Sequence, residues 1–218
     1  MSAFLGHIHF WLYKKIRLVI DRENLILEES EKRLDDLATE LHSTAIDLYG
    51  APISADAKLE DIIDHSNIHG WLQGQIETAS VREGSFIKDL LDCGGSDAEE
   101  AIIAAFTIQG KACGTVAKDQ LATVTRPQEI YQIMQDYYLN GMPCDGGDDV
   151  ITDSDEEFTW EGSHKNQVAN WTKSGVDQSF MRHAYQAWFK AFVEAVNPAY
   201  TFTVDAQAAV PVYKIVKA

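Results

Sequence analysis

The chain lacks the local motifs that most often reveal an enzyme. Its 218 residues contain no glycine-rich loop of the kind that cradles phosphates and no glycine-flanked serine of the kind found at a nucleophile elbow. Gly110 and Lys111 resemble the end of a phosphate-binding loop, but Ala112 follows where that loop requires serine or threonine. The sequence therefore gives no sign of nucleotide binding or of serine-hydrolase chemistry.

Cysteine is also scarce. The chain has three cysteines, Cys93, Cys113 and Cys144, and no two of them stand at the C-x-x-C spacing used for zinc binding or redox chemistry. An odd number of widely spaced cysteines does not form a disulfide framework. The pattern predicts reduced thiols in a cytoplasmic protein.

Basic residues are few, with 18 against 34 acidic residues and a formal net charge of −16. Affinity for nucleic acid comes largely from basic side chains, so we expect no nucleic-acid partner. The charge is uneven, because residues 1–19 hold three basic side chains and no acid, whereas residues 145–161 hold acids and no base. This asymmetry would suit a contact between two copies in a homo-oligomer or between the two ends of the chain, although a solvated surface is the simpler explanation.

No hydrophobic run is long enough to cross a bilayer, so we predict no transmembrane segment. The apolar stretch 4–13 is interrupted by two histidines and followed by basic residues, with no small-residue cleavage site after it, so it does not resemble a signal peptide. Its aromatic side chains favour a helix that packs on its own domain or on a partner. These aromatic residues are Phe4, Phe10, Trp11 and Tyr13.

Helical periodicity is the strongest pattern that is present. Residues 4–49 hold strong helix formers with leucines along one stripe and end at Gly50, which predicts one long helix or two consecutive ones. A second pattern ends at Gly94-Gly95, and we expect a break in it near Gly84. Further helices are predicted at residues 59–63, after the capping box 96–99, from Pro127 to Gly141, and over 176–196.

Strand patterns occur only in the last third of the chain. Residues 158–160 and 167–171 alternate weakly, and residues 200–204 and 210–216 are clearer β-rich runs. A polar, acidic loop over 142–157 precedes them. We therefore predict a mainly α-helical bundle of four to six helices with a small C-terminal antiparallel β element, an α+β arrangement. Residues 1–218 would form one compact domain, in which residues 1–141 are helical and residues 158–218 mix strands with a helix.

The segment Asp61 to His69 holds the only two histidines of the sequence that fall at the helical spacing of four residues, with an acidic residue four before the first. His65 and His69 are four residues apart, so on one helix they could chelate an ion, and Asp61 could hold the ring of His65 as a supporting partner. On a continuous helix Asp61 and His69 would lie about 12 Å apart, too far for all three to bind one ion. Ser66 and Asn67 favour turns, and a turn there would remove the helical spacing.

Two histidines leave at least one ligand missing from a zinc or iron site. His7, His9 or an acidic residue of the first helical segment is the most economical source of that ligand. On a helix His7 and His9 point in nearly opposite directions, so they do not share an ion with each other. Exposed histidine pairs also occur on plain solvated helices, and the sequence leaves metal binding and a polar surface open.

Two weaker patterns lie near the acidic loop. Cys144 is in a glycine-rich turn, and His164 could approach it as the base of a cysteine nucleophile, although nearby acids would raise the thiol pKa and oppose this. The acidic run 145–157 invites a calcium interpretation, but it lacks the D-x-D-x-D-G ladder and the final glutamate of an EF-hand loop. A structural turn and a solvated loop are the alternatives.

The leading functional hypothesis is a cytoplasmic binding or sensory module that holds a divalent metal or a small ligand between its helices. One alternative is a structural or interaction protein that associates through its aromatic N-terminal helix. Another is a cysteine-dependent enzyme using Cys144 and His164.

Overall fold

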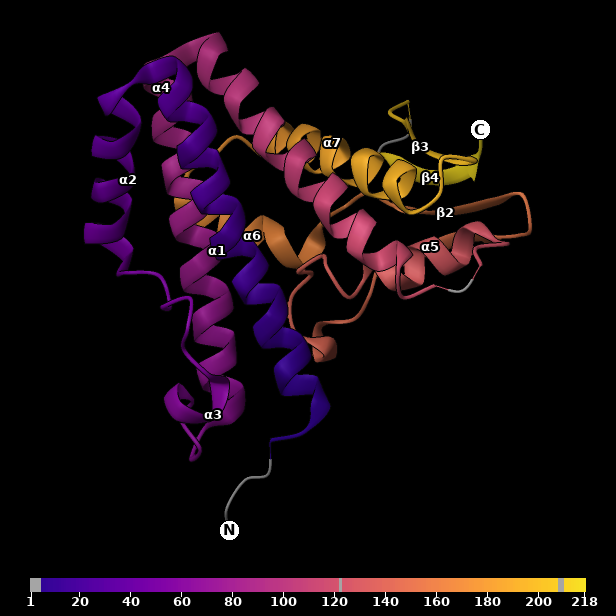
Figure 1. The fold of residues 1–218 in the computed structure, drawn as a ribbon, viewed down its shortest axis with the longest axis horizontal. Helices are drawn as coiled ribbons and strands as arrows, with labels where there is room; N and C mark the ends of the chain where they lie inside the picture. The colour runs from indigo at the N-terminus through magenta and orange to yellow at the C-terminus, as the bar shows by residue number, and fades with distance from the viewer. Residues whose placement is uncertain (1–4, 122, 208–209) are drawn as a thin grey trace.

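The fold is mainly α-helical with a small antiparallel sheet near the C-terminus, as the sequence predicted (Figure 1). The structure is a computed structural model that describes residues 5–121, 123–207 and 210–218. The helices are α1 (His7–Leu34), α2 (Asp36–Tyr49), α3 (Leu59–Ile62), α4 (Ile68–Lys118), α5 (Pro127–Met134), α6 (Lys165–Ser174) and α7 (Gln178–Val196), with a 3-10 turn η1 (Pro143–Asp145). The strands are β1 (Val150–Asp153), β2 (Glu157–Glu161), β3 (Tyr200–Asp205) and β4 (Val212–Lys217).

Three backbone reversals delimit the long helices. α1 ends at Asp35, whose φ is 50°, and α2 ends at Gly50, whose φ is 89°. Inside α4 the backbone leaves the helical region at Gly95, with φ 52° and ψ −130°, so α4 is two helical segments joined at a kink. The predicted stops at Gly50 and at Gly94-Gly95 are thus confirmed, because glycine adopts positive φ at little cost.

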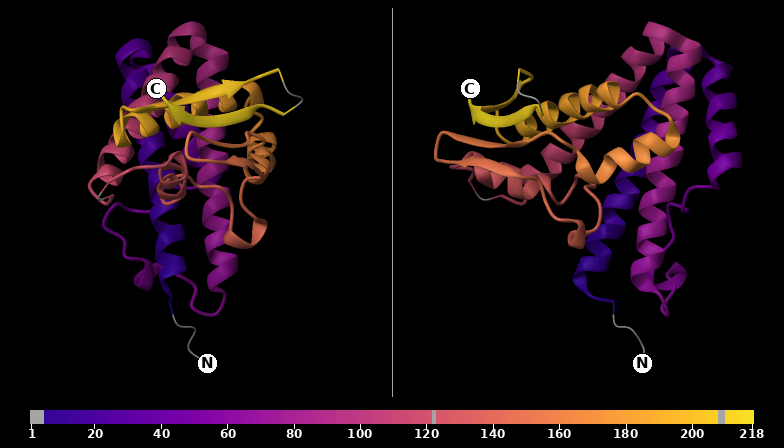
Figure 2. Two further views of the ribbon diagram at one scale, coloured as in Figure 1. Left: turned by 90° about the vertical axis from the view of Figure 1, so that its right-hand side faces the viewer. Right: turned by 180° about the vertical axis from the view of Figure 1, so that it is seen from behind.

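α4 is the central element of the bundle. α1 and α2 pack against it on one side and α7 on the other, with α2 and the sheet at opposite ends of the molecule (Figures 1 and 2). α7 approaches α4 closely, since a Cβ added at Gly110 would lie 2.4 Å from the carbonyl oxygen of Trp188. One buried hydrophobic cluster extends from α1 and α2 through α4 to α7 and the sheet. The middle of α7 therefore packs directly against α4.

The sheet has the strand order β1-β2-β4-β3, and all neighbours are antiparallel. Phe158 and Trp160 of β2 stand opposite Ile215 and Tyr213 of β4, and all four side chains are buried. The aromatic rings of β2 contact Tyr131 of α5, and Trp160 and Tyr213 also contact the α7 side of the core. The sheet thereby closes one end of the hydrophobic core.

Five sequence expectations were wrong in detail. Residues 167–171 belong to helix α6, because Gln167, Asn170, Trp171 and Ser174 are buried at helical spacing rather than alternating. α4 runs through Gly84 without a break, and the missing side chain there lets Ser174 of α6 pack against it.

The helix that starts at Pro127 ends at Met134, well before Gly141, and the acidic segment 142–157 contains η1 and β1. The described residues form seven α-helices rather than four to six, and α6 is the helix that the strand prediction over residues 167–171 had excluded. Among the described residues, no helix is both long and apolar enough to span a membrane.

Candidate functional site

Three polar side chains lie on the same face of α7. Ser179, Arg182 and Gln186 are separated by three and four residues, so they line one side of the helix near its start. Asp177 caps the helix by accepting a hydrogen bond from the Phe180 amide at 2.7 Å. The opposite side is buried in the core, with Met181, Ala184, Tyr185, Trp188, Phe189 and Phe192.

These three side chains line a surface pocket of about 460 Å³. The rest of its lining comes from Ser163, just before α6, and from Val210 and Pro211, just before β4. Segments far apart in the sequence thus meet at one point, and the polar groups they present are hydroxyl, guanidinium and amide. A pocket of this size can hold a small molecule.

Arg182 is exceptional among the arginines. Its guanidinium makes a long hydrogen bond of 3.4 Å to the carbonyl oxygen of Gln178 and lies 5.9 Å from the ring centre of Trp171. Across the residues that the structure describes, it is the only arginine without a carboxylate partner. Each of the other five arginines pairs with a carboxylate. The pairs are Arg17–Asp21, Arg22–Glu83, Arg33–Glu100, Arg82–Glu23 and Arg126–Asp153.

Behind the pocket lies a buried chain of hydrogen bonds. The amide nitrogen of Gln186 is 3.5 Å from the hydroxyl of Tyr213, and that hydroxyl is 2.9 Å from Nε2 of His164. Nδ1 of His164 is 2.8 Å from the hydroxyl of Tyr138. The chain therefore runs from the pocket lining into the core, through one amide, two tyrosines and one histidine.

His164 is buried, has a left-handed backbone conformation and carries a neutral ring. It is 3% exposed, and its φ of 50° is rare for residues other than glycine. Burial, with a smaller contribution from the positive charge of Arg182, lowers the pKa of His164 to about 3. The ring is therefore neutral at neutral pH, with one nitrogen donating a hydrogen bond and the other accepting one.

Asp148 lies on the far side of this chain. Its carboxylate accepts hydrogen bonds from the hydroxyl of Tyr131 at 3.0 Å and from the side-chain amide of Asn140 at 2.9 Å. Burial raises the pKa of Asp148 despite these bonds. Asp148 and Tyr138 also line a crevice that leaves no room for a water-sized group, so the buried end of the chain is closed.

The structure does not bring the predicted metal ligands together as one set. α3 ends at Ile62 and α4 begins at Ile68, so His65 lies in the turn between them while His69 is in α4. Nε2 of His65 is 3.1 Å from the carbonyl oxygen of Glu60. The continuous helix that the spacing of Asp61, His65 and His69 required is therefore absent.

Two histidines from different helices do meet. The rings of His9 on α1 and His69 on α4 have centroids 5.8 Å apart. Nδ1 of His9 accepts a hydrogen bond from the Gly6 amide at 3.0 Å, so it helps to cap α1 and is engaged. His7 is exposed on the same helix. Within the described residues, no group of three or more His, Cys, Asp or Glu side chains is placed to hold a metal ion.

The residues of the proposed thiol site have other partners. Both ring nitrogens of His164 are engaged by tyrosine hydroxyls, and the thiol of Cys144 contacts Asp145 at 3.9 Å. His164 is buried, whereas Cys144 is exposed in η1. A neutral histidine with two tyrosine partners offers no base to this thiol.

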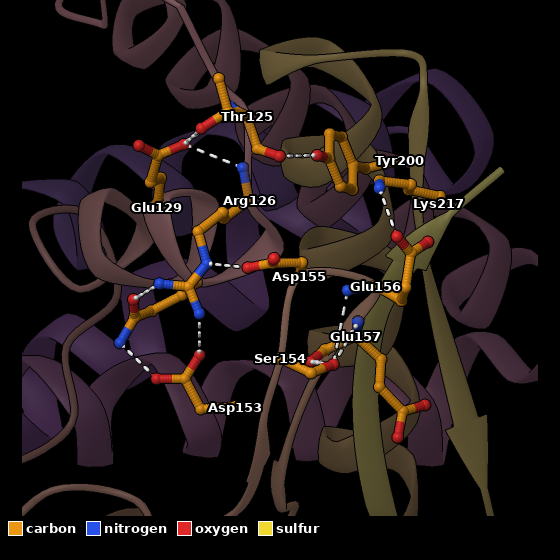
Figure 3. Close-up of polar contacts among 11 residues, drawn as sticks. Thr125, Arg126, Glu129, Asp153, Ser154, Asp155, Glu156, Glu157, Tyr200 and Lys217 are labelled. Atoms are coloured by element: carbon orange, nitrogen blue, oxygen red, sulfur yellow. Dashed lines mark hydrogen bonds and ion pairs between the residues drawn. The ribbon is translucent and has the colours of Figure 1, made fainter.

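Four of the acids around β1 and β2 pair with cations, and three of them are drawn in Figure 3. Arg126 reaches both Asp153 and Asp155, at 3.1 and 2.8 Å, and Lys217 reaches Glu156 at 2.8 Å. Lys165 pairs with Asp149 at 3.0 Å in the same region. These pairs tie the hairpin to α5, α6 and β4, which favours a structural role over the calcium interpretation.

The aromatic start of α1 packs mostly within its own chain. The indole of Trp11 donates to Asp136 at 2.8 Å, and the hydroxyl of Tyr13 donates to the carbonyl of Ala57 at 2.8 Å. Ile8 and Phe10 stay 42% and 43% exposed, so association of chains through this end remains a prediction. Phe4 lies outside the described residues.

Sequence reasoning missed the residues of the pocket. Ser179, Arg182 and Gln186 form a polar stripe opposite the apolar face of α7, and that stripe was the available signal. Ser163 and Pro211 carry no pattern of their own and join the site only through the fold. No known protein family, curated protein or solved structure matches this chain.

Proposed function

We propose that the protein is a cytoplasmic binding or sensory module that holds a small anion, a carboxylate or a phosphate, in the pocket around Arg182. The observation that carries the proposal is the guanidinium of Arg182, which lines a pocket yet has no carboxylate partner among the described residues. Arginine presents several N–H groups in a planar fork that matches carboxylate and phosphate oxygens.

The position of this guanidinium contrasts with the acidic composition of the whole chain. With 34 acidic and only 18 basic residues, carboxylates are abundant, yet none of those the structure describes occupies the fork of Arg182. Ser163 and Ser179 add hydroxyl donors on either side of the pocket. An anion held here would accept hydrogen bonds from three side chains and compensate a cation that has no other carboxylate partner.

The cytoplasmic element of the proposal is supported by the thiols. Cys93, Cys113 and Cys144 are all free, and two of them are exposed. Exposed free thiols are typical of proteins in reducing compartments.

Isothermal titration calorimetry tests anion binding directly. The folded chain would be titrated with inorganic phosphate, propanoate and succinate in a buffer of low ionic strength, together with Arg182→Gln and the control Arg33→Gln. Arg33 is also a surface arginine, but it is paired with Glu100 at 2.7 Å. We expect at least one anion to bind the wild type and Arg33→Gln, and the affinity to fall about tenfold or more in Arg182→Gln, because a charge-assisted hydrogen-bonded pair is lost.

The proposal fails if no anion binds the wild type, or if Arg182→Gln binds as the wild type does. Phosphate and carboxylates are compared in the same experiment, so the result also identifies which group the pocket accepts.

A metal ion on His9 and His69 is a second candidate, favoured by the 5.8 Å approach of the two rings. Metal analysis of tag-free protein reconstituted with zinc or iron tests it, with His69→Ala as the variant and exposed His183→Ala as the control. Retention of the same metal content by His69→Ala would exclude this site.

A further inference from the structure

We propose that Gln186 makes the Arg182 pocket selective for small carboxylates that also carry a hydroxyl or amino group, and that Tyr213 and His164 are positioning residues that fix the amide of Gln186 in the required orientation. This inference rests on the proposed function, because it specifies the anion that the pocket would hold.

The amide of Gln186 has two different ends. Its nitrogen points to the Tyr213 hydroxyl at 3.5 Å, which leaves its carbonyl oxygen as the end available to the pocket. Among the described residues no hydrogen bond engages that oxygen. Gln186 thus presents an acceptor to the pocket, next to the donors of Arg182.

The direction of the hydrogen-bond chain is coupled to which end of Gln186 faces Tyr213. A tyrosine hydroxyl has one proton, and in the arrangement that uses it Tyr213 accepts from Gln186 and donates to Nε2 of His164, 2.9 Å away. The proton of the neutral imidazole is then on Nδ1 and is donated to Tyr138, 2.8 Å away. Each of these three contacts has one donor and one acceptor.

Turning the Gln186 amide over would require the whole chain to reverse, so that Tyr138 donates to Nδ1, Nε2 donates to Tyr213, and Tyr213 donates to the Gln186 oxygen. The reversed chain makes the same number of hydrogen bonds, but it turns its protons away from the carboxylate of Asp148 and towards the guanidinium of Arg182, which these two charges disfavour. Tyr213 is fully buried and its ring is packed against Phe189 and Phe202, which prevents it from moving away. The orientation that presents an acceptor to the pocket is therefore favoured by groups that a ligand never touches.

A complementary ligand needs an anionic group for Arg182 and a donor for Gln186. The two residues are one helical turn apart, about 6 Å along the axis, and their side chains converge on one pocket. The donor must therefore lie within a few bonds of the carboxylate. Small hydroxycarboxylates and amino acids meet this requirement, whereas a plain carboxylate of the same size leaves the Gln186 oxygen without a partner.

The test compares ligands with and without the donor, and lactate and malate add it without adding a charge. Propanoate, lactate and alanine form one series, and succinate and malate form a second. In calorimetric titrations of the wild type we expect the member with a donor to bind about threefold to tenfold more tightly, the effect of one hydrogen bond. Gln186→Leu removes the acceptor and should bring the affinities within each series together, while the plain carboxylate keeps its affinity.

Tyr213→Phe tests the positioning role. It frees the amide to turn, so the preference for the donor should shrink while binding of propanoate and succinate through Arg182 remains. Tyr200→Phe is the matched control, since it also removes a tyrosine hydroxyl from the sheet, one that bonds to the carbonyl of Thr125. Should Tyr213→Phe fail to fold, the half-buried Gln186→Leu still decides the ligand preference, and His164→Asn carries the positioning test.

The outcomes separate this inference from the proposed function. Absence of binding by phosphate and by every carboxylate overturns the proposed function itself, whereas binding of phosphate alone leaves the anion pocket standing and overturns this inference. Binding without a preference for the donor, or a preference that survives in Gln186→Leu, leaves the anion pocket standing and overturns the selectivity for a donor. A preference that is unchanged in both Tyr213→Phe and His164→Asn overturns the positioning role.

Discussion

The helical part and the mixed part of the molecule both bury polar groups, but they use different chemistry. Between α1, α2 and α4, Arg22 pairs with Glu83 at 2.7 Å, and Glu23 pairs with Arg82 at 2.9 Å and contacts His42 at 2.8 Å. Next to the sheet, the buried chain of Tyr138, His164 and Tyr213 contains no formal charge. The first network pairs opposite charges, whereas the second contains only neutral groups.

The difference relates to solvent access. In the charged network two adjacent residues of α1, Arg22 and Glu23, face two adjacent residues of α4, Arg82 and Glu83, so two positive and two negative groups cancel within a closed interface. The neutral chain instead ends at Gln186, which lines an open pocket. We infer that the first network holds α1 and α4 in register, whereas the second supports a site.

Breaking the charged network should produce the largest effect. Glu83→Ala leaves the buried guanidinium of Arg22 without its carboxylate, and removing one partner of a buried pair costs about 3–5 kcal/mol. The free energy of unfolding from urea titrations measures this. Glu77→Ala is the control, because Glu77 pairs with Lys173 at an exposed position, where about 1 kcal/mol or less is expected. Equal losses in the two variants would contradict a special role for the buried pair.

The stability that the neutral chain contributes should fall in acid. The pKa of His164 falls from 6.5 in the unfolded chain to about 3 in the folded one, so between these values the unfolded state binds the extra proton. Stability from this group is therefore complete above pH 6.5 and is lost as the pH falls towards 3, by on the order of 4 kcal/mol.

Urea titrations of the wild type and His164→Asn between pH 7.5 and pH 3.5 test this. Asparagine tolerates the left-handed backbone and does not titrate in this range. The difference in unfolding free energy between the two proteins should shrink as the pH falls. A difference that does not change with pH would show that His164 is not held neutral.

The features of the fold that the sequence predicted are those determined locally. Helix ends at Gly50 and Gly95 follow from the backbone freedom of glycine, and the start of α5 at Pro127 follows from a proline that loses no hydrogen bond in a first turn. α6 was missed because its buried positions include Gln167 and Asn170, which become buried only through tertiary contacts.

The candidate site was less predictable for the same reason. Arg182 matters because no described carboxylate reaches it, and the partner of a surface arginine is a property of the folded chain. His164 was noticed only as a base for Cys144, whereas its partners, Tyr138 and Tyr213, lie 26 and 49 residues away. Histidines at helical spacing, by contrast, were visible in the sequence but were separated by a turn that Ser66 and Asn67 already indicated.

Removing one hydroxyl from the neutral chain should have a smaller effect than either change above. Tyr138→Phe leaves Nδ1 of buried His164 without a partner, which costs about 1–3 kcal/mol. Tyr200→Phe again serves as the control, since the carbonyl of Thr125 lies in an exposed segment and can bond to water. Chemical denaturation at pH 7.5 measures both, and a loss in Tyr138→Phe no larger than in Tyr200→Phe would argue against a continuous chain.

Arg182 should contribute least to stability, although it is the residue on which the proposed site depends. Arg182→Gln breaks no ion pair among the described residues, so the change in unfolding free energy at pH 7.5 should stay within about 0.5 kcal/mol.

The positive charge of Arg182 also lowers the pKa of His164, so Arg182→Gln should make the acid-induced loss of stability smaller. Without the cation a proton on the imidazole is less unfavourable, the folded pKa rises towards that of the unfolded chain, and less stability is lost on acidification. Arg33→Gln, which is remote from the neutral chain, should leave the acid profile unchanged. If Arg182→Gln instead destabilises the protein as strongly as Glu83→Ala, then Arg182 holds the fold together, and the contrast between a closed charged network and an open neutral one does not hold.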